Sequence, residues 1–238
     1  MTSCEFKVLT EFLSFPLENS DPVFEKFIAM KKGVFHGSEK RRFLYIPGRR
    51  KNKVLLVAHA DTWWEYYCEN DVVFEDGRFF STGEYGIGAD DRAGCAIVWL
   101  LKDSGHSILI TDGEERGVLG SCYLYSQHRE IYDEINREHQ FMVEFDRRNG
   151  NDFKCYDSGS SDFKKYVALK TGFSEPDKKS TTDIAVLCNK ICGVNLSIGF
   201  YNEHTENEHL IYEEWLNTLN ISRKWLKEKY LPKFKLIR

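Results

Sequence analysis

The stretch Gly86-Ile-Gly-Ala-Asp90-Asp91-Arg92-Ala-Gly94 joins a glycine-rich loop to a helix that we expect to begin near Asp91 and to run to Leu101. Two adjacent carboxylates stand at this junction. One of them can cap the helix, because aspartate accepts hydrogen bonds from the free N–H groups of a first turn. The other then lies beside it with the same charge, which is unfavourable unless a cation is bound there. The stretch therefore indicates a cation site and raises the question of which other residues complete it.

The composition excludes several classes of protein. The chain has 238 residues and a formal net charge of −4, with 42% hydrophobic and 29% charged residues, as in globular proteins with a substantial core. The acidic balance argues against a nucleic-acid partner. With no signal peptide and no apolar run of about 18 residues, we expect no membrane partner. Of the seven cysteines, those in apolar segments indicate reduced thiols and a cytoplasmic protein.

Short apolar strands alternate with amphipathic helices along the chain. Helices are expected over residues 4–13, from an Asp21 cap to Gly33, and over 117–135, 161–171, 182–191 and 212–230. Strands are expected over 42–46, 53–58, 107–111, 140–145 and 194–198, with a hairpin over 72–81. This alternation predicts an α/β fold, a three-layer αβα sandwich with a mixed, largely parallel central sheet.

Metal-binding side chains follow each of the predicted central strands. They are His59 and Asp61, Glu114 and Glu115, Asp146, and His204. The carboxyl ends of strands in an open α/β sheet meet at the edge where ligands bind. These groups are therefore expected to converge with Asp90 at one edge of the sheet.

Imidazole and carboxylate groups suit zinc, and five ligands hold two ions if one carboxylate bridges them. We expect Asp90 to be the bridge. One ion would take His59, Asp90 and Asp146, and the other would take Asp90, Glu115 and His204. The same set also accepts cobalt or manganese. A hydroxide shared by two zinc ions attacks a carbonyl near neutral pH, and the ions stabilise the resulting oxyanion.

Two further acids fit roles beside the ligands. Asp61 lies two residues after His59, so on a strand it points to the same side and can orient the imidazole. Glu114 can take a proton from the attacking water and return it to the leaving amine, as a general base and acid. His209 competes with His204 as the second imidazole ligand.

Five motifs resemble the signature of the co-catalytic di-zinc exopeptidases: His59-x-Asp61, Gly88-Ala-Asp90-Asp91-Arg92-Ala-Gly94, Glu114-Glu115-x-Gly117, Asp146 and His204-x-x-x-Glu208. That superfamily includes peptidase T, the glutamyl aminopeptidases, the bacterial leucyl aminopeptidases and the acylamino-acid deacylases. The sequence Asp-Asp-Arg-Ala-Gly (residues 90–94) most resembles that of the glutamyl aminopeptidase group. The resemblance covers about residues 54–210 and implies the fold, two zinc ions and a cis peptide between Asp90 and Asp91.

The chain departs from its larger relatives in two short intervals. The glutamyl aminopeptidase group carries a small extra domain between the positions of Asp61 and Asp90, and the peptidase T and deacylase groups carry a dimerisation lid between those of Asp146 and His204. We therefore expect residues 1–238 to form a single catalytic domain without a lid or dimerisation insertion. Without that segment, the oligomeric state stays open.

Two local segments have more than one reading. Trp63 and Trp64 begin an aromatic run that either lines the substrate site as an apolar wall or packs in the core around the hairpin. Ser180-Thr-Thr-Asp183 is most simply a cap for the next helix, although a similar Thr-Asp step lies near the substrate site in relatives.

The full set predicts a di-zinc metallohydrolase that cleaves a peptide or related amide bond, most simply an aminopeptidase. The alternative is an N-acyl-amino-acid deacylase, another amidohydrolase or a carboxypeptidase. An arginine facing the substrate, such as Arg92, Arg147 or Arg148, would favour a substrate carboxylate. A non-catalytic metal-binding module that engages a partner is less favoured, because Glu114 completes a catalytic set.

Overall fold

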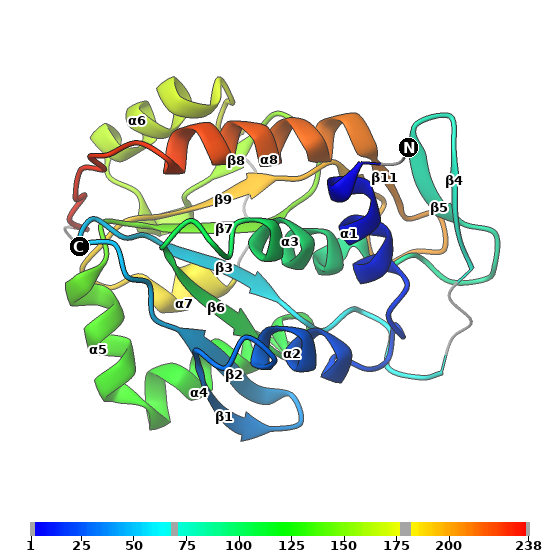
Figure 1. Cartoon of the computed structure of the whole chain (residues 1–238), viewed down its shortest axis with the longest axis horizontal. Helices are drawn as coiled ribbons and strands as arrows, with labels where there is room; N and C mark the ends of the chain where they lie inside the picture. Colours follow the sequence, from blue (N-terminus) through cyan, green and yellow to red (C-terminus); the bar gives the residue numbers. More distant parts are fainter. Residues whose placement is uncertain (1–2, 68–70, 177–181, 237–238) are drawn as a thin grey trace.

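The computed structural model describes residues 3–67, 71–176 and 182–236 (Figure 1). Within these residues, the main sheet has the order β1-β2-β6-β3-β7-β9-β8. Its strands are β1 (Val34–Ser38), β2 (Arg41–Ile46), β3 (Leu55–His59), β6 (Ser107–Thr111), β7 (Met142–Arg147), β8 (Phe153–Lys154) and β9 (Gly193–Ser197). The four central strands β6, β3, β7 and β9 pair in parallel, and the outer strands pair antiparallel. The predicted mixed sheet is confirmed, with its parallel part in the centre.

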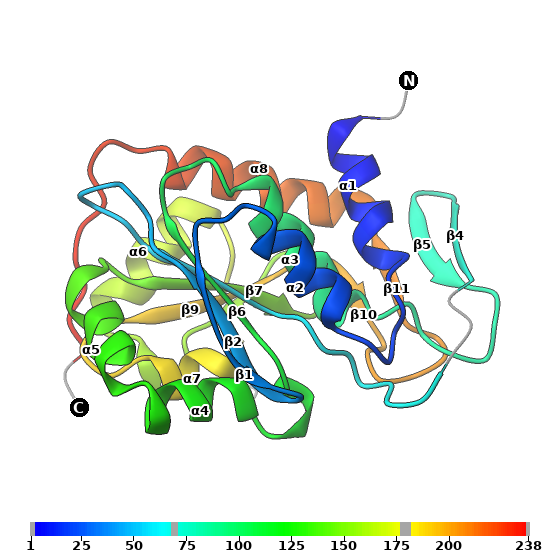
Figure 2. The same ribbon diagram turned by 60° about the horizontal axis from the view of Figure 1, so that its bottom comes forward.

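Helices cover both faces of this sheet (Figure 2). One face carries α1 (Cys4–Leu13), α2 (Asp21–Ile28), α3 (Ala89–Leu100), α6 (Ser161–Thr171) and α8 (Tyr212–Leu226). The other face carries α4 (Leu119–Gln127), α5 (Arg129–Glu138) and α7 (Asp183–Leu187). The predicted three-layer αβα sandwich is therefore confirmed. No helix among the described residues has the length and apolarity needed to span a bilayer.

Strand β3 is a continuous apolar run in the sequence because both of its faces are buried. All five of its residues are buried. Leu56 and Ala58 pack in the hydrophobic cluster under α3, and Leu55 and Val57 pack in the cluster under α4 and α5, because successive side chains leave a strand on opposite faces. Burying each such leucine contributes about 2 kcal/mol. Both faces thus hold β3 in place and fix the position of His59 at its end.

A second sheet lies beside the carboxyl edge of the first. Its order is β10 (Phe200–Tyr201), β11 (His209–Ile211), β5 (Arg78–Ser81) and β4 (Val72–Glu75). The hairpin predicted over 72–81 is confirmed, and its turn residues Asp76 and Gly77 both have the positive φ that a two-residue hairpin turn requires. Pairing of β11 with β5 brings the segment 200–211 next to the hairpin. The strands β1, β8, β10 and β11 were not predicted.

Four predicted helices end earlier or break. The helix expected to begin with a cap at Asp21 starts at that residue with Ser20 before it, and it ends at Ile28 rather than near Gly33. The segment 117–135 forms two helices, because the backbone of His128 is not helical (φ −125°, ψ 51°). The last helix ends at Leu226 rather than at Tyr230.

The helix predicted over 182–191 ends at Leu187 because the following backbone bonds elsewhere. The Asn136 side chain accepts hydrogen bonds from the N–H groups of Asn189 and Lys190 and donates one to the Leu187 carbonyl oxygen. Ser180 and Thr181 of the expected cap lie outside the described residues, and the Thr182 side chain makes no capping bond.

Candidate metal centre

Five side chains predicted as metal ligands meet at the carboxyl edge of the main sheet. His59 is the last residue of β3, Asp146 lies near the end of β7, and Asp90 lies at the start of α3. Glu115 lies in a 3₁₀ turn (Glu114–Arg116) after β6, and His204 lies in the turn after β10. The parallel strands β3, β6 and β7 thus deliver three of these groups to one edge, where ligands bind in α/β sheets. The start of α3 and the turn after β10 bring Asp90 and His204 to the same place.

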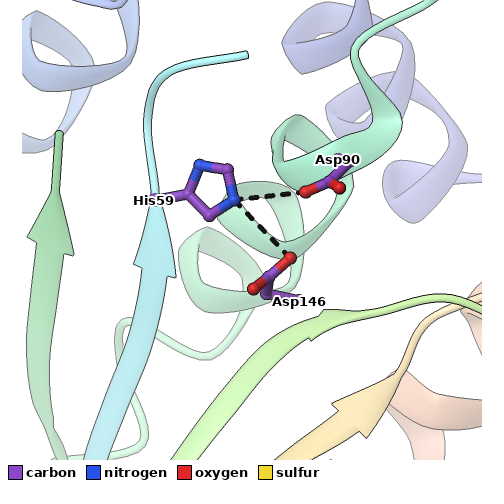
Figure 3. A group of neighbouring side chains, drawn as sticks. All are labelled: His59, Asp90 and Asp146. Carbon is purple, nitrogen blue, oxygen red and sulfur yellow. Dashed lines mark hydrogen bonds and ion pairs between the residues drawn. The ribbon is translucent and has the colours of Figure 1, made fainter. Parts of the chain in front are cut away.

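The first triad consists of His59, Asp90 and Asp146 (Figure 3). His59 Nε2 lies 3.1 Å from Asp90 Oδ1 and 3.5 Å from Asp146 Oδ1. The three side chains point toward one another from β3, α3 and β7 (Figure 3). The His59 side chain is 1% exposed, and the two carboxylates are 11% and 8% exposed. This triad is therefore nearly closed to solvent.

The second triad consists of Asp90, Glu115 and His204. His204 Nε2 lies 2.9 Å from Glu115 Oε1 and 3.4 Å from Asp90 Oδ2. Asp90 therefore faces one imidazole with each of its oxygens, as a bridging carboxylate would. In each triad, the potential ligand atoms lie within 4.8 Å of one another. That spacing suits a small divalent ion bound at about 2 Å by each ligand.

The two adjacent aspartates point in different directions. The peptide bond between Asp90 and Asp91 is cis, as the family resemblance implies. The backbone of Asp90 and Asp91 is not helical, so the regular part of α3 starts after these two residues. Asp91 is buried and accepts hydrogen bonds from the backbone N–H groups of His59 and of Gly94, which lies in the first regular turn of α3. Gly94 is required at its position, because a Cβ there would collide with the Phe145 carbonyl oxygen and with the Asp91 carboxylate. Asp91 is thus the capping residue, and Asp90 is the one that faces the other ligands.

Glu208 fixes the loop before Asp90, a role that the sequence analysis missed. This carboxylate is 2% exposed and accepts hydrogen bonds from the N–H groups of Ile87, Gly88 and Asp90 at 2.9, 2.7 and 3.1 Å. A Cβ at Gly86 would lie 2.6 Å from Glu208 Oε2. The signal available in the sequence was the motif His204-x-x-x-Glu208.

Asp61 and Glu114 lie next to the first triad. His59 Nδ1 is 3.1 Å from the Asp61 carbonyl oxygen and 3.4 Å from Asp61 Oδ1. Asp61 Oδ1 also accepts a hydrogen bond from the Glu114 backbone N–H at 3.2 Å. The Asp61 side chain thus links the end of β3 to the turn that carries Glu114 and Glu115.

Asp146 is held by two residues that the sequence analysis did not assign to it. Thr182 Oγ1 donates a hydrogen bond to Asp146 Oδ2 at 2.8 Å. The Asn195 side chain accepts from the Asp146 N–H at 2.9 Å and donates to its carbonyl oxygen at 2.7 Å. These bonds leave Asp146 Oδ1 directed at His59 (Figure 3).

The electrostatics of the cluster favour a bound cation. Burial and the charge of Asp90 raise the pKa of Asp146 to about 7. Burial, together with the charges of Asp146 and Asp183, raises the pKa of Glu114 to about 10. Burial opposes the charged form of His204, but Asp90 and Glu115 raise its pKa to about 10. Protons thus compensate for crowded negative charge, and divalent cations would displace them, because cations stabilise carboxylates and neutral imidazoles. The residues therefore fit a metal pair.

A cavity of about 140 Å³ opens beside both triads. It is lined by Asp90, Glu114, Glu115, Asp146, Arg147, Arg148, Tyr156, Thr182, Phe200, Glu203 and His204. Arg92 lies elsewhere, since it is buried and donates to the carbonyl oxygens of Pro16 and Asn19.

Trp63 and Trp64 are not among the lining residues. Trp63 stacks on His204 instead, and Trp64 packs edge-on against Tyr85. His209, the competing ligand candidate, belongs to neither triad of the described residues and contacts the Asn207 carbonyl oxygen.

Comparison with known proteins finds similar structures. No family model and no curated protein sequence matches the chain. The fold is similar to that of a tripeptidase from Staphylococcus aureus, with 13% identity, a TM-score of 0.68 and coverage of 94% of this chain and 97% of that one. It is similar to aminopeptidase PepT from Bacillus cereus, with 14% identity, a TM-score of 0.66 and coverage of 94% and 98%.

A third structure is the TET1 peptidase of Pyrococcus horikoshii, which can assemble into a tetrahedron or a large octahedral shell. It is 13% identical, with a TM-score of 0.62 and coverage of 94% of this chain and 98% of that one. All three similarities extend over nearly the whole of both chains. The chain therefore has the same fold as these three peptidases.

Proposed function

We propose that this protein is a metal-dependent aminopeptidase with two zinc ions in the two triads. The proposal rests on the position of Asp90. One of its carboxylate oxygens faces His59 and the other faces His204, and the half-buried Glu114 lines the cavity beside them. Peptidases with the same fold support this reaction class. Cobalt or manganese would fit the same ligands.

His59, Asp90 and Asp146 would hold one ion, and Asp90, Glu115 and His204 the other. The two metal ions, when bound, would supply an activated water and stabilise the oxyanion formed at the scissile carbonyl. Glu114 lines the cavity and accepts the proton of the attacking water, then returns it to the leaving amine. Asp61 orients His59 through its second ring nitrogen.

The two arginines of the cavity do not favour a substrate carboxylate. Among the described residues, the lining contains five carboxylates and two guanidinium groups. Arg147 is already paired with Asp152 at 2.6 Å, and Arg148 is paired with Glu203. Each guanidinium therefore already has a carboxylate partner and is not left unpaired for a substrate carboxylate. Three of the five carboxylates are the proposed metal ligands, whose negative charge bound ions would offset, so the preference rests on the paired arginines. This favours an aminopeptidase over the alternative deacylase or carboxypeptidase.

We further propose a single catalytic domain over residues 1–238, without an inserted lid, acting on peptides or small amides in the cytoplasm. The buried thiols of Cys95, Cys155 and Cys192, which form no disulfide, suit that reducing compartment. Trp63 and Trp64 stay candidates for contacting substrate groups that extend beyond the cavity.

The test combines metal analysis with turnover. Purified protein should contain about two metal ions per chain, and a chelator should abolish hydrolysis of amino-acid amides and peptides until zinc, cobalt or manganese is restored. Glu114→Gln should lower kcat by about 10²–10⁴-fold while the metal content stays at two. The matched control is Glu130→Gln, an exposed residue of α5.

Two results would contradict the proposal. Full turnover in Glu114→Gln on the best substrate would remove the assigned base. Two bound ions without hydrolysis of any peptide, amide or acyl-amino-acid substrate would favour the non-catalytic metal-binding module.

A further inference from the structure

The proposed ligand His204 is held differently from its counterpart His59. Its side chain is 36% exposed, against 1% for His59, and it lies in a turn with a positive φ of 66°. A metal-binding histidine usually fixes its ring by a hydrogen bond from the second ring nitrogen. His59 has Asp61 for this purpose, but within the described residues no hydrogen bond is found for His204 Nδ1. Another contact must therefore set the orientation of the His204 ring.

That contact is the indole of Trp63. The two rings are stacked with centroids 4.6 Å apart and an angle of 17° between their planes. Trp63 is 42% exposed, so it does not serve the hydrophobic core. Stacking fixes the plane of the imidazole and leaves Nε2 free to point at Glu115 and Asp90, the other members of the second triad.

The indole is itself anchored to the turn that carries Glu115. The Arg116 guanidinium lies 5.0 Å from the centre of the Trp63 ring and donates a hydrogen bond to the Trp63 carbonyl oxygen at 2.7 Å. Arg116 also bonds Glu65 at 2.6 Å. Because Arg116 is the last residue of the turn Glu114–Arg116, Trp63 connects two ligands of the same triad.

We propose that Trp63 is the positioning residue of His204 and sets the metal affinity of the triad Asp90, Glu115 and His204 without affecting the triad around His59. The inference rests on the proposed metal pair. It assigns the start of the aromatic run to a ligand rather than to the core. It also makes the two metal sites unequal. The first triad orients His59 by hydrogen bonding, and the second triad orients His204 by stacking.

The test is a cobalt titration of chelator-treated protein, followed by the visible absorption of bound Co²⁺. Trp63→Leu should raise the dissociation constant of one cobalt ion about tenfold, the lower end for losing a group that orients a metal ligand, and leave the other unchanged. Trp63→Phe keeps a ring and should bind both ions nearly as the wild type does. Trp64→Leu is the matched control, since Trp64 packs on Tyr85 and should leave both constants unchanged.

A double-mutant comparison separates positioning from a general structural effect. His204→Ala should abolish binding of the same cobalt ion that Trp63→Leu binds more weakly. Adding Trp63→Leu to His204→Ala should not change the dissociation constant of the cobalt ion that remains. Arg116→Met removes the contacts of the guanidinium with Trp63 and should weaken binding of the same cobalt ion to a smaller extent. It also provides an independent test should Trp63→Leu fail to fold.

Unchanged cobalt binding in both Trp63→Leu and Arg116→Met would overturn the inference. Equal weakening of both ions, or weakening of the remaining ion in the His204→Ala background, would overturn it as well. If the wild-type protein bound no cobalt pair, the metal centre itself would be wrong, and the failure would be distinguishable from that of Trp63.

Discussion

The carboxylate of Glu208 accepts a hydrogen bond from the backbone N–H of Asp90 at 3.1 Å, across 118 positions of sequence. Its other oxygen accepts from Ile87 and Gly88. Burial acts to raise the pKa of Glu208, to about 8, even though the three N–H groups lower it. One buried acid thus holds the loop that presents the proposed bridging carboxylate, and this relationship leads to the first prediction.

Glu208→Gln should weaken metal binding in both triads, because Asp90 belongs to each of them. The amide keeps the size of the side chain but loses the second acceptor oxygen, so at least one loop N–H loses its partner. We expect a 10–100-fold rise in the dissociation constants of both ions, measured by cobalt titration. Glu206→Gln, an exposed neighbour in the same turn, is the control. Weakening of a single ion would contradict the shared role of Asp90.

Gly94→Ala should destabilise the fold and displace the start of α3. The new Cβ would meet the Phe145 carbonyl oxygen and the Asp91 carboxylate. Overpacking of this kind costs about 1–3 kcal/mol in the free energy of unfolding, measured by urea denaturation. Gly83→Ala is the control, because its nearest neighbour would be Ser81 Oγ at 3.5 Å. Equal stability of the two variants would show that the helix start can shift at no cost.

Arg148→Met tests which substrate terminus the cavity recognises. Arg148 is paired with Glu203 at the cavity wall, so its loss makes the cavity more negative. For an aminopeptidase, kcat/KM should stay the same or rise on an amino-acid amide, which carries an ammonium group and no carboxylate. Arg129→Met, an exposed change on α5, should alter nothing. A fall of about tenfold or more confined to N-acyl amino acids would instead support the alternative deacylase, because a hydrogen bond to a charged group contributes about 1.5–3 kcal/mol.

Because His139 is buried, we expect the protein to lose stability in mild acid. It is buried between the Ile135 carbonyl oxygen and Ser107 Oγ, and burial lowers its pKa to about 4. The unfolded state, with a histidine pKa of about 6.5, therefore binds more protons between pH 6.5 and 4, so stability is complete above pH 6.5 and falls as the pH drops toward 4.

The free energy of unfolding of the wild type should thus decrease over this window by up to about 3 kcal/mol from His139. His139→Asn keeps a polar side chain that does not titrate, and its pH slope should be smaller. Gln127→Asn, an exposed change of a side chain that does not titrate at the end of α4, should keep the wild-type slope. Parallel slopes for all three proteins would show that His139 does not bind its proton on unfolding.

The sequence by itself determined the central strands, the Asp76-Gly77 hairpin and the groups that follow each strand. Apolar runs, positive-φ turn residues and helix periodicity are local properties, so β3 with His59 and β6 with Glu115 are readable without a partner strand. The pairing of His59 with Asp146 around Asp90 followed from the rule that parallel strands end at one edge.

Only the tertiary structure decided how these groups are held. The short strands β8, β10 and β11 exist because of their partners, and two or three residues carry no periodicity of their own. Glu208, Thr182 and Trp63 reach the centre from distant segments, and their contacts depend on side-chain direction in three dimensions. Local pattern can name the residues that would bind the ions, but orientation is set by hydrogen bonds and stacking that form after the chain has folded.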